Sequence, residues 1–319
     1  MNVDGVTKPA IDVVIVNWNS TEQLGLCLGS IADSDRESID LGRIVVIDNA
    51  SREFFIEDKH RESLPLEVIE NTRNIGFAAA CNQGAKICSS DHVLFLNPDV
   101  ELGRDSLAMS VGWLATTDGG IGICGIRLLN DDGRCETSCA DFPNLKMYIG
   151  TALGLARWLP RHFPSRFHSA CRLERSGVVD QVSGAFFLVK KALFDRIGGF
   201  DERFFVYYEE VDLSLRAKKA GFHSYYLAEA VASHIGGTST GQAGPRRLFY
   251  YLQSRLKYAK KNFEPLSYLL LLQFTLGVEF VLRSLRALGR KDEDLRSTLT
   301  AFGMLWAWLM KEGTGTRDL

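Results

Sequence analysis

The stretch RFFVYYEEVDLSLR, residues 203–216, gathers residue types that can do acid–base chemistry. Three carboxylates, Glu209, Glu210 and Asp212, fall within four positions, after a run rich in Phe and Tyr and before a helical pattern. Acids this close raise one another's pKa, which keeps one of them basic enough to take a proton from a hydroxyl group. A charged first helical turn would explain one or two acids, but not the aromatic run. The cluster is therefore a candidate site of acid–base chemistry.

Polar residues also follow three apolar runs in the N-terminal part of the chain. The runs 11–16, 43–47 and 92–96 are nearly continuous in apolar residues, as in strands buried in a parallel sheet. Helical patterns at 20–32 and 76–88 separate them, which predicts a βαβα order. The strand ends would then share one edge, where such sheets bind ligands. The polar residues at these ends are Asn17, Asn19, Asp48, Asn49, Asn97 and Asp99.

The pattern changes after residue 120. Residues 122–135 predict two strands joined by a turn at 131–133, and 140–176 is irregular and rich in Arg. A strand near 182–189 is followed by a short helix and a Gly-Gly stop. The chain has no GxGxxG after its first strand and no GxxxxGK[ST] motif, so dinucleotide-binding and P-loop functions lose their main support.

Composition narrows the class of protein. The chain has 319 residues, 46% hydrophobic and 24% charged, which is typical of a globular protein with an ample core. Residues 246–319 carry 13 basic residues (Lys and Arg) and 7 acidic ones (Asp and Glu). Residues 1–245 carry 24 basic and 32 acidic residues. The acidic body argues against a nucleic-acid partner, and the basic tail suits anionic lipid or an anionic acceptor.

Cysteine usage and the N-terminus indicate the compartment. The seven cysteines occur singly and without a CxxC pair, which fits a reducing compartment better than a disulfide framework or a zinc site. The N-terminal stretch MNVDGVTKPA has neither a basic start nor an apolar segment, so no signal peptide is expected.

Two apolar segments lie in the basic tail. Residues 265–286 are almost apolar but contain Gln273 and Glu279, which makes them marginal for a membrane span. Residues 299–311 are shorter and contain two Trp. Three arrangements are compatible with these two segments. They could be helices that lie on a membrane surface, or helices that pack on the rest of the chain or in a homodimer interface. A membrane-spanning helix is the third arrangement and has the least support.

Six motifs in order resemble the family 2 glycosyltransferases with the GT-A fold, and most of all their rhamnosyltransferase-like bacterial members. They are VVIVNWNS, VVIDNASRE, NTRNIGFAAACNQGAK, VLFLNPDVEL, VSGAFFLVKKALFDRIGGFDERFFVYYEEVDLSLRAKKAGF and HIGGTST, within residues 10–240. The resemblance implies an α/β fold with a Rossmann-like, mostly parallel central sheet. The expected catalytic domain is 1–245, with a nucleotide-sugar half at about 10–120 and an acceptor half at about 121–245. A helical C-terminal region, 246–319, follows.

The resemblance also implies the reaction. The chain would transfer a sugar with inversion, best L-rhamnose from dTDP-rhamnose, to a lipid-linked or cell-envelope glycan at the inner, cytoplasmic face of the membrane. Asn97-Pro98-Asp99 matches the family's DxD motif with Asn in the first place, and Asp99 and His234 are the implied ligands of Mg²⁺ or Mn²⁺. Such a cation neutralises the leaving diphosphate. A sugar-phosphate nucleotidyltransferase and a non-catalytic sugar-nucleotide-binding or glycan-binding protein remain alternatives.

The family motifs assign further residues. The implied donor-binding residues are Val16, Asn17, Asn19, Asp48, Asn49, Arg73, Asn74, Gly76, Phe77, Asn82, Asn97 and Asp99. The implied acceptor-binding residues are Ser183, Gly184, Ala185 and Tyr208. The family has Glu-Asp, with the second acid as base, where this chain has Glu209-Glu210, so we expect Glu210 to be the base. Asp212 is placed to pair with Arg216 on the helix face it shares with Glu209, and Glu210 then points elsewhere.

Overall fold

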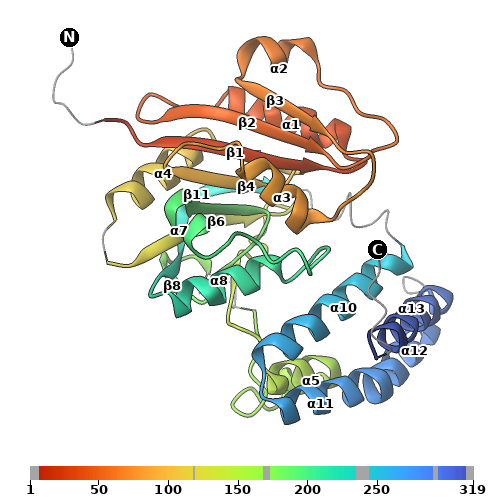
Figure 1. Ribbon diagram of the computed structural model, residues 1–319. Coiled ribbons are helices and arrows are strands. Elements are labelled where there is room, and N and C mark those ends of the chain that lie inside the picture. Colours follow the sequence, from red (N-terminus) through yellow and green to blue (C-terminus); the bar gives the residue numbers. More distant parts are fainter. Residues whose placement is uncertain (1–6, 118, 168–172, 235–243, 290–293, 314–319) are drawn as a thin grey trace, which may run out of the picture. The chain divides into compact units, whose positions relative to one another are not determined.

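The computed structural model describes residues 7–117, 119–167, 173–234, 244–289 and 294–313 (Figure 1). The chain forms two compact units, and each is described by itself. The first unit comprises Met1–Phe142, Phe167–Glu202 and Glu209–Thr238. The second comprises Pro143–Arg166, Arg203–Tyr208 and Ser239–Leu319. The division into residues 1–245 and 246–319 stays a prediction.

One sheet organises the first unit, in the strand order β3-β2-β1-β4-β10-β6-β11-β5, with β8 paired to β11. The strands are β1 (Ala10–Asn17), β2 (Asp40–Asp48), β3 (Leu66–Glu70), β4 (His92–Leu96), β5 (Val100–Leu102), β6 (Ile121–Leu129), β8 (Gly177–Val179), β10 (Phe186–Lys190) and β11 (His223–His234). Strands β3, β2, β1 and β4 are parallel, as are β6 and β11, while β10 runs antiparallel to both its neighbours. The expected α/β fold with a mostly parallel sheet is confirmed.

Helices cover both faces of this sheet (Figure 1). One face carries α1 (Thr21–Ala32) and α4 (Ser106–Thr116). The other carries α3 (Phe77–Ala85), α7 (Lys191–Arg196) and α8 (Glu209–Lys219). Side chains alternate along a strand, so Ile11, Val13 and Ile15 of β1 pack on one face while Val14 and Val16 pack on the other. Burial on both faces explains why the central strands are continuous in apolar residues.

Three predicted features differ in the structure. Residues 140–176, predicted to be irregular, contain the helix α5 (Leu145–Leu153). The strand predicted near 182–189 is two strands, because the small residues Ser183-Gly184-Ala185 separate β9 (Gln181–Val182) from β10. Strand β9 pairs with β7 (Cys139–Ala140) in a small separate sheet. The second strand of the predicted hairpin is reduced to one bridge, between Leu129 and Cys135.

The second unit is helical. Its elements are α5 (Leu145–Leu153), a 3-10 turn (Leu155–Arg157), α10 (Pro245–Asn262), α11 (Pro265–Phe274), a π-helical turn (Thr275–Glu279), α12 (Phe280–Gly289) and α13 (Leu295–Gly313). Residues 265–288 form one helix whose length and mean hydropathy of 1.6 would allow it to cross a membrane, and 17% of its most apolar window is buried.

A buried ion pair joins two helices of this unit. Arg255 of α10 donates from Nη1 and Nη2 to the two carboxylate oxygens of Glu279 at 3.2 and 2.5 Å, and both side chains are 3% exposed. Arg283 donates to Glu279 at 2.9 Å, and Thr275 accepts from Arg255 at 2.8 Å. Burial acts to raise the pKa of Glu279, but the two guanidinium groups outweigh it and lower that pKa. The long apolar helix is thus held to α10 by charges that water cannot reach.

Glu279→Gln should lower the free energy of unfolding by about 3–5 kcal/mol at pH 7, because it leaves Arg255 buried without its counter-ion. The folded pKa of Glu279 is depressed, so its contribution is complete above its unfolded pKa of about 4.3 and is lost as pH falls through the folded pKa. Urea unfolding of both proteins at pH 7 and below pH 4 measures the difference, which should shrink in acid.

Glu312→Gln is the matched control for this experiment. Its partner Lys260 lies 3.2 Å away, but the two side chains are 61% and 38% exposed, so the change should cost less than about 1 kcal/mol. Equal losses for Glu279→Gln and Glu312→Gln would contradict the assigned role of the buried pair.

Candidate active site

The carboxyl ends of β1 and β2 are tied together by a buried polar cluster. Asn17 donates from Nδ2 to Asp48 Oδ1 at 2.9 Å and to Ser51 Oγ at 3.1 Å, and Ser51 N donates to Asp48 Oδ2 at 3.0 Å. Asn17 and Asp48 are nearly inaccessible, and Asn17 Oδ1 is buried without a hydrogen-bond partner. Asn19, with a φ of 52°, accepts from the Arg52 backbone at 2.9 Å. The cluster fixes the strand ends at which a donor was expected.

The second predicted donor segment is held by Asn49. Its Oδ1 accepts from Ile75 N at 3.1 Å, and its Nδ2 donates to Asn74 Oδ1 at 2.9 Å. Asn74 Oδ1 also accepts from Gly76 N at 2.9 Å. Gly76 precedes α3 with a φ of 89°, which a side chain would strain. The helix N-terminus is therefore built as the sequence predicts, with Asn49 as its support.

The other predicted donor residues lie in different surroundings. Arg73 is exposed and Phe77 is half-buried at the start of α3, whereas the Val16 side chain packs in the core. Asn82 exchanges two hydrogen bonds with the backbone of Phe200, at 2.8 and 2.9 Å. Asn82 therefore positions the segment before the acid cluster, and its donor-binding role stays a prediction.

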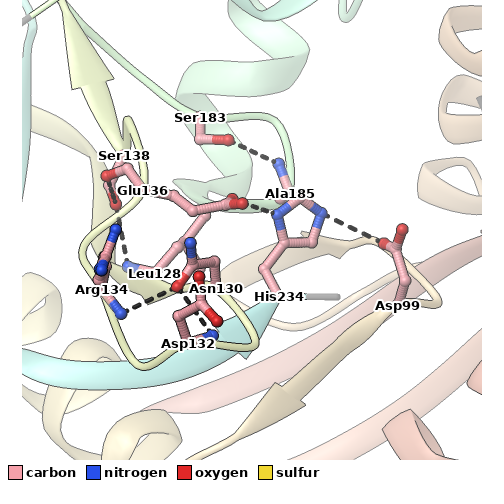
Figure 2. Close-up of polar contacts among 10 residues, drawn as sticks. All are labelled: Asp99, Leu128, Asn130, Asp132, Arg134, Glu136, Ser138, Ser183, Ala185 and His234. Carbon is pink, nitrogen blue, oxygen red and sulfur yellow. Dashed lines mark hydrogen bonds and ion pairs between the residues drawn. The ribbon is translucent and has the colours of Figure 1, made fainter. Parts of the chain in front are cut away.

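Asp99 and His234 meet at the far end of the sheet (Figure 2). Strands β5 and β11 pair antiparallel there, with His234 opposite Val100. His234 Nε2 lies 3.4 Å from Asp99 Oδ1, and its Nδ1 lies 2.8 Å from Glu136 Oε2. Burial acts to lower the pKa of His234, but its contacts with Asp99 and Glu136 outweigh it and raise the pKa to about 9. The remainder of the predicted motif, 235–240, lies outside the described residues.

These groups fit a divalent cation with few protein ligands. Asp99 is 8% exposed, and its buried Oδ1 makes no hydrogen bond beyond the long, 3.4 Å ion-pair contact with His234 Nε2, as expected for an oxygen that serves another ligand. A carboxylate and an imidazole suit Mn²⁺, and a diphosphate and water would complete the shell. Within the described residues, no set of three or more His, Cys, Asp or Glu is arranged as a complete metal site.

The loop Ser183–Ala185 lies beside the predicted base. A Cβ on Gly184 would lie 3.7 Å from Cβ and Cγ of Glu210, an ordinary van der Waals distance, so the loop and this acid are neighbours. Ala185 O accepts from Asn97 N at 2.9 Å, and Ser183 N donates to Ser138 O at 2.8 Å. The predicted acceptor loop therefore contacts both the strand end that carries Asp99 and the helix that carries Glu210.

The three acids of the cluster have different surroundings. Asp212 is fully buried and accepts from Arg216 Nε at 2.7 Å, which confirms the expected i,i+4 pair. Arg216 also donates to the carbonyls of Ile197 and Gly199, so Asp212 anchors the preceding loop. Glu209 is 5% exposed, and burial followed by the charge of Glu210 raises its pKa well above its usual range. Glu210 alone among the three is partly exposed.

The aromatic residues before the acids belong to the second unit. Tyr207 and Tyr208 have φ values of 68° and 71°, a conformation that costs energy for residues other than Gly. Tyr208 is 2% exposed and its hydroxyl accepts from that of Tyr148 at 3.0 Å, while Phe205 stacks on Tyr250. The aromatic run is thus core that holds a strained turn, and acceptor binding by Tyr208 stays a prediction.

Sequence reasoning missed Glu136. It lies 98 positions before His234 and directly after the predicted hairpin of residues 122–135. Its side chain is 31% exposed and belongs to no motif, so nothing in the local pattern distinguishes it from a surface acid.

Comparison with solved structures defines the class of protein. The chain superposes on a GT-A mannosyltransferase, PcManGT from Pyrobaculum calidifontis, solved with GDP-Man and Mn²⁺, with a TM-score of 0.52 and 17% identity over 98% of this chain and 81% of that one. It also superposes on residues 1–349 of TarS from S. aureus, solved with UDP-GlcNAc. The TM-score is 0.53 and the identity 14%, over 98% of this chain and 93% of the TarS chain. It covers 47% of a longer solved TarS chain. The fold is that of the GT-A glycosyltransferases.

The sequence then gives the family. A model described as glycosyltransferase like family 2 matches residues 9–256, and the chain belongs to this family and is a glycosyltransferase. It is 27% identical to the N-acetylglucosaminyl-diphospho-decaprenol L-rhamnosyltransferase of Mycobacterium tuberculosis over 73% of this chain and 78% of the relative. It is 26% identical to the rhamnosyltransferase WbbL of Escherichia coli over 56% of this chain and 67% of that relative.

Proposed function

We propose that the protein transfers L-rhamnose from dTDP-rhamnose, with inversion, to a hydroxyl group of a lipid-linked or cell-envelope glycan. The observation that carries this proposal is the loop Ser183–Ala185, which contacts the Asn97–Asp99 strand end on one side and Glu210 on the other. Donor, acceptor and base can therefore meet at one point of the first unit. Two relatives are rhamnosyltransferases, and this supports the choice of sugar.

The proposed cation would bind the diphosphate of the donor. Asp99 and His234 Nε2 would hold Mg²⁺ or Mn²⁺, which supplies positive charge to the diphosphate as it leaves. The N-terminus of α3, fixed by Asn49 and Gly76, presents backbone N–H groups that favour the same phosphates. Mn²⁺ in the solved mannosyltransferase complex supports a divalent cation here.

Glu210 is the proposed base because its surroundings differ from those of the neighbouring acids. Asp212 is neutralised by Arg216, and burial favours the neutral form of Glu209. Glu210 is partly exposed and lies beside the acceptor loop, where it could take a proton from an acceptor hydroxyl. A nucleotidyltransferase would place a Gly-rich, basic loop after the first strand, and NWNSTEQLG at 17–25 is neither.

Glu210→Gln should reduce turnover by roughly 10²–10⁴ while leaving dTDP affinity unchanged, because it removes basicity and keeps size and polarity. Glu209→Gln is the matched control. Because burial raises the pKa of Glu209, replacing its carboxyl group with an amide should matter less, and most activity should remain. Steady-state transfer from dTDP-rhamnose, with dTDP binding measured by calorimetry, checks both variants.

Two results would contradict this assignment. An active Glu210→Gln beside an inactive Glu209→Gln or Asp212→Asn would move the base to another member of the cluster. Full activity in all three variants would exclude an acid of this cluster as the base.

Metal and nucleotide should bind cooperatively, because the diphosphate becomes a ligand of the cation, and each should tighten the other by the same factor. Asp99→Asn should lose most of this coupling, since it removes the charge that holds the cation. Calorimetry of dTDP binding with Mn²⁺ and with EDTA measures the coupling. Equal affinity under both conditions, with full transfer activity in EDTA, would show a metal-independent enzyme.

We also propose that the second unit attaches to the membrane surface. The helix 265–288 buries Glu279 on one side and exposes apolar side chains on another, so it is suited to lie in the interface rather than to cross it. The exposed apolar residues are Leu266, Leu269, Leu270, Val278, Val281, Leu285 and Leu288. Trp306 of α13 is 50% exposed, and the C-terminal part has an excess of basic residues. One relative is named for a decaprenol-linked substrate, and a substrate of that kind would lie at such a surface.

Binding to phosphatidylglycerol vesicles should therefore be measurable at low salt and weaken as salt is added, because surface charges are screened over about 8–10 Å near physiological ionic strength. Leu285→Asp with Leu288→Asp should abolish it, whereas Leu26→Asp, at a 53% exposed position of α1, should not. Vesicle co-sedimentation checks both. A protein that ignores vesicles and forms a dimer lost on deleting 265–319 would show instead that the apolar face is a dimer interface.

A further inference from the structure

We propose that Glu136 is a positioning residue that orients His234 for the cation, by accepting a hydrogen bond from Nδ1–H so that Nε2 is the nitrogen directed at Asp99. The inference rests on the proposed cation site of Asp99 and His234. Glu136 lies outside every motif of the sequence, in the segment that follows β6.

The geometry separates the two nitrogens of the ring (Figure 2). Nδ1 lies 2.8 Å from Glu136 Oε2, whereas Nε2 makes a longer, 3.4 Å ion-pair contact with the buried Oδ1 of Asp99. A neutral imidazole has one N–H and one lone pair, so the partner of one nitrogen decides what the other can bind. When a cation replaces the proton on Nε2, a carboxylate on Nδ1 keeps the other proton in place, so that Nε2 is the nitrogen that binds the metal.

The backbone around Glu136 is fixed on both sides. Its N–H donates to Leu128 O at 2.8 Å, and its carbonyl accepts from Ser138 Oγ at 3.1 Å. Ser138 Oγ in turn accepts from Leu128 N at 2.9 Å. Asn130 Oδ1 closes the turn by accepting from the backbone N–H groups of Asp132 and Arg134 (Figure 2). The carboxylate therefore projects from a rigid turn, which is what orienting a ring requires.

This turn also reaches the acceptor side. Ser138 O accepts from Ser183 N at 2.8 Å, and Ser183 Oγ accepts from Ala185 N at 3.2 Å. The residues that orient His234 and the loop beside Glu210 are thus consecutive members of one hydrogen-bonded chain. A displacement of the turn would move the cation side and the acceptor side together.

The test is a Mn²⁺ titration of the full chain, with free Mn²⁺ followed by electron paramagnetic resonance. Glu136→Ala should raise the Kd for Mn²⁺ by about 10–100-fold, the usual effect of removing a partner of a metal-bound His. Glu136→Gln should raise it less, because its amide oxygen can still accept from Nδ1–H. Asp132→Asn is the control: it removes a negative charge from the same exposed turn without touching His234, and should change the Kd by less than about twofold.

A double-mutant cycle separates orientation from general loss of structure. If Glu136 acts through His234, Glu136→Ala should have almost no further effect on the Kd in a His234→Ala background. Additive losses in the double variant, or equal Kd values for Glu136→Ala and wild type, would overturn the inference and leave the cation site standing. Wild-type protein that binds no Mn²⁺ would overturn the cation site and this inference with it.

Discussion

The site depends on the backbone contacts of one short loop, Ser183–Ala185. Its two hydrogen bonds, to Asn97 and to Ser138, and its contact with Glu210 join three segments that are far apart in the chain. The loop interrupts what would otherwise be one strand, and the interruption frees its backbone for these contacts. A Cβ on Gly184 would be in ordinary van der Waals contact with Glu210, at 3.7 Å, so the loop lies directly beside this acid.

Chemically similar acids of the site have different surroundings. Asp212 has a guanidinium partner, Glu209 is buried beside another acid, and Glu210 has partial access to solvent. The same principle operates at the other end of the site, where Asp99 and Glu136 contact opposite nitrogens of one histidine. Environments that push the protonation of like groups apart are how a protein assigns acid, base and ligand roles.

In the second unit, a buried ion pair determines which side of an apolar helix is exposed. A helix as apolar as 265–288 would be free to insert in a membrane if nothing held one side of it. The buried contacts of Arg255 with Glu279 and Thr275 give that side a partner within the protein and leave the leucine-rich side exposed. The local π-helical turn places both Thr275 and Glu279 toward Arg255. π-helical turns of this kind often accompany functional positions.

The sequence by itself determined the central sheet, its parallel first half and the edge on which the polar residues meet, because period and strand-end chemistry are local properties. The Asp212–Arg216 pair also follows from local spacing, whereas the split of the strand near 182–189 does not, because it depends on Ser183–Ala185 contacting distant segments. Only the tertiary structure decided that Asn82 holds Phe200, that Glu136 reaches His234, and that Glu279 is neutralised by Arg255. Each of these is a contact between residues distant in sequence, and a side chain's pKa and partner are set by what surrounds it in space rather than by its neighbours in the chain.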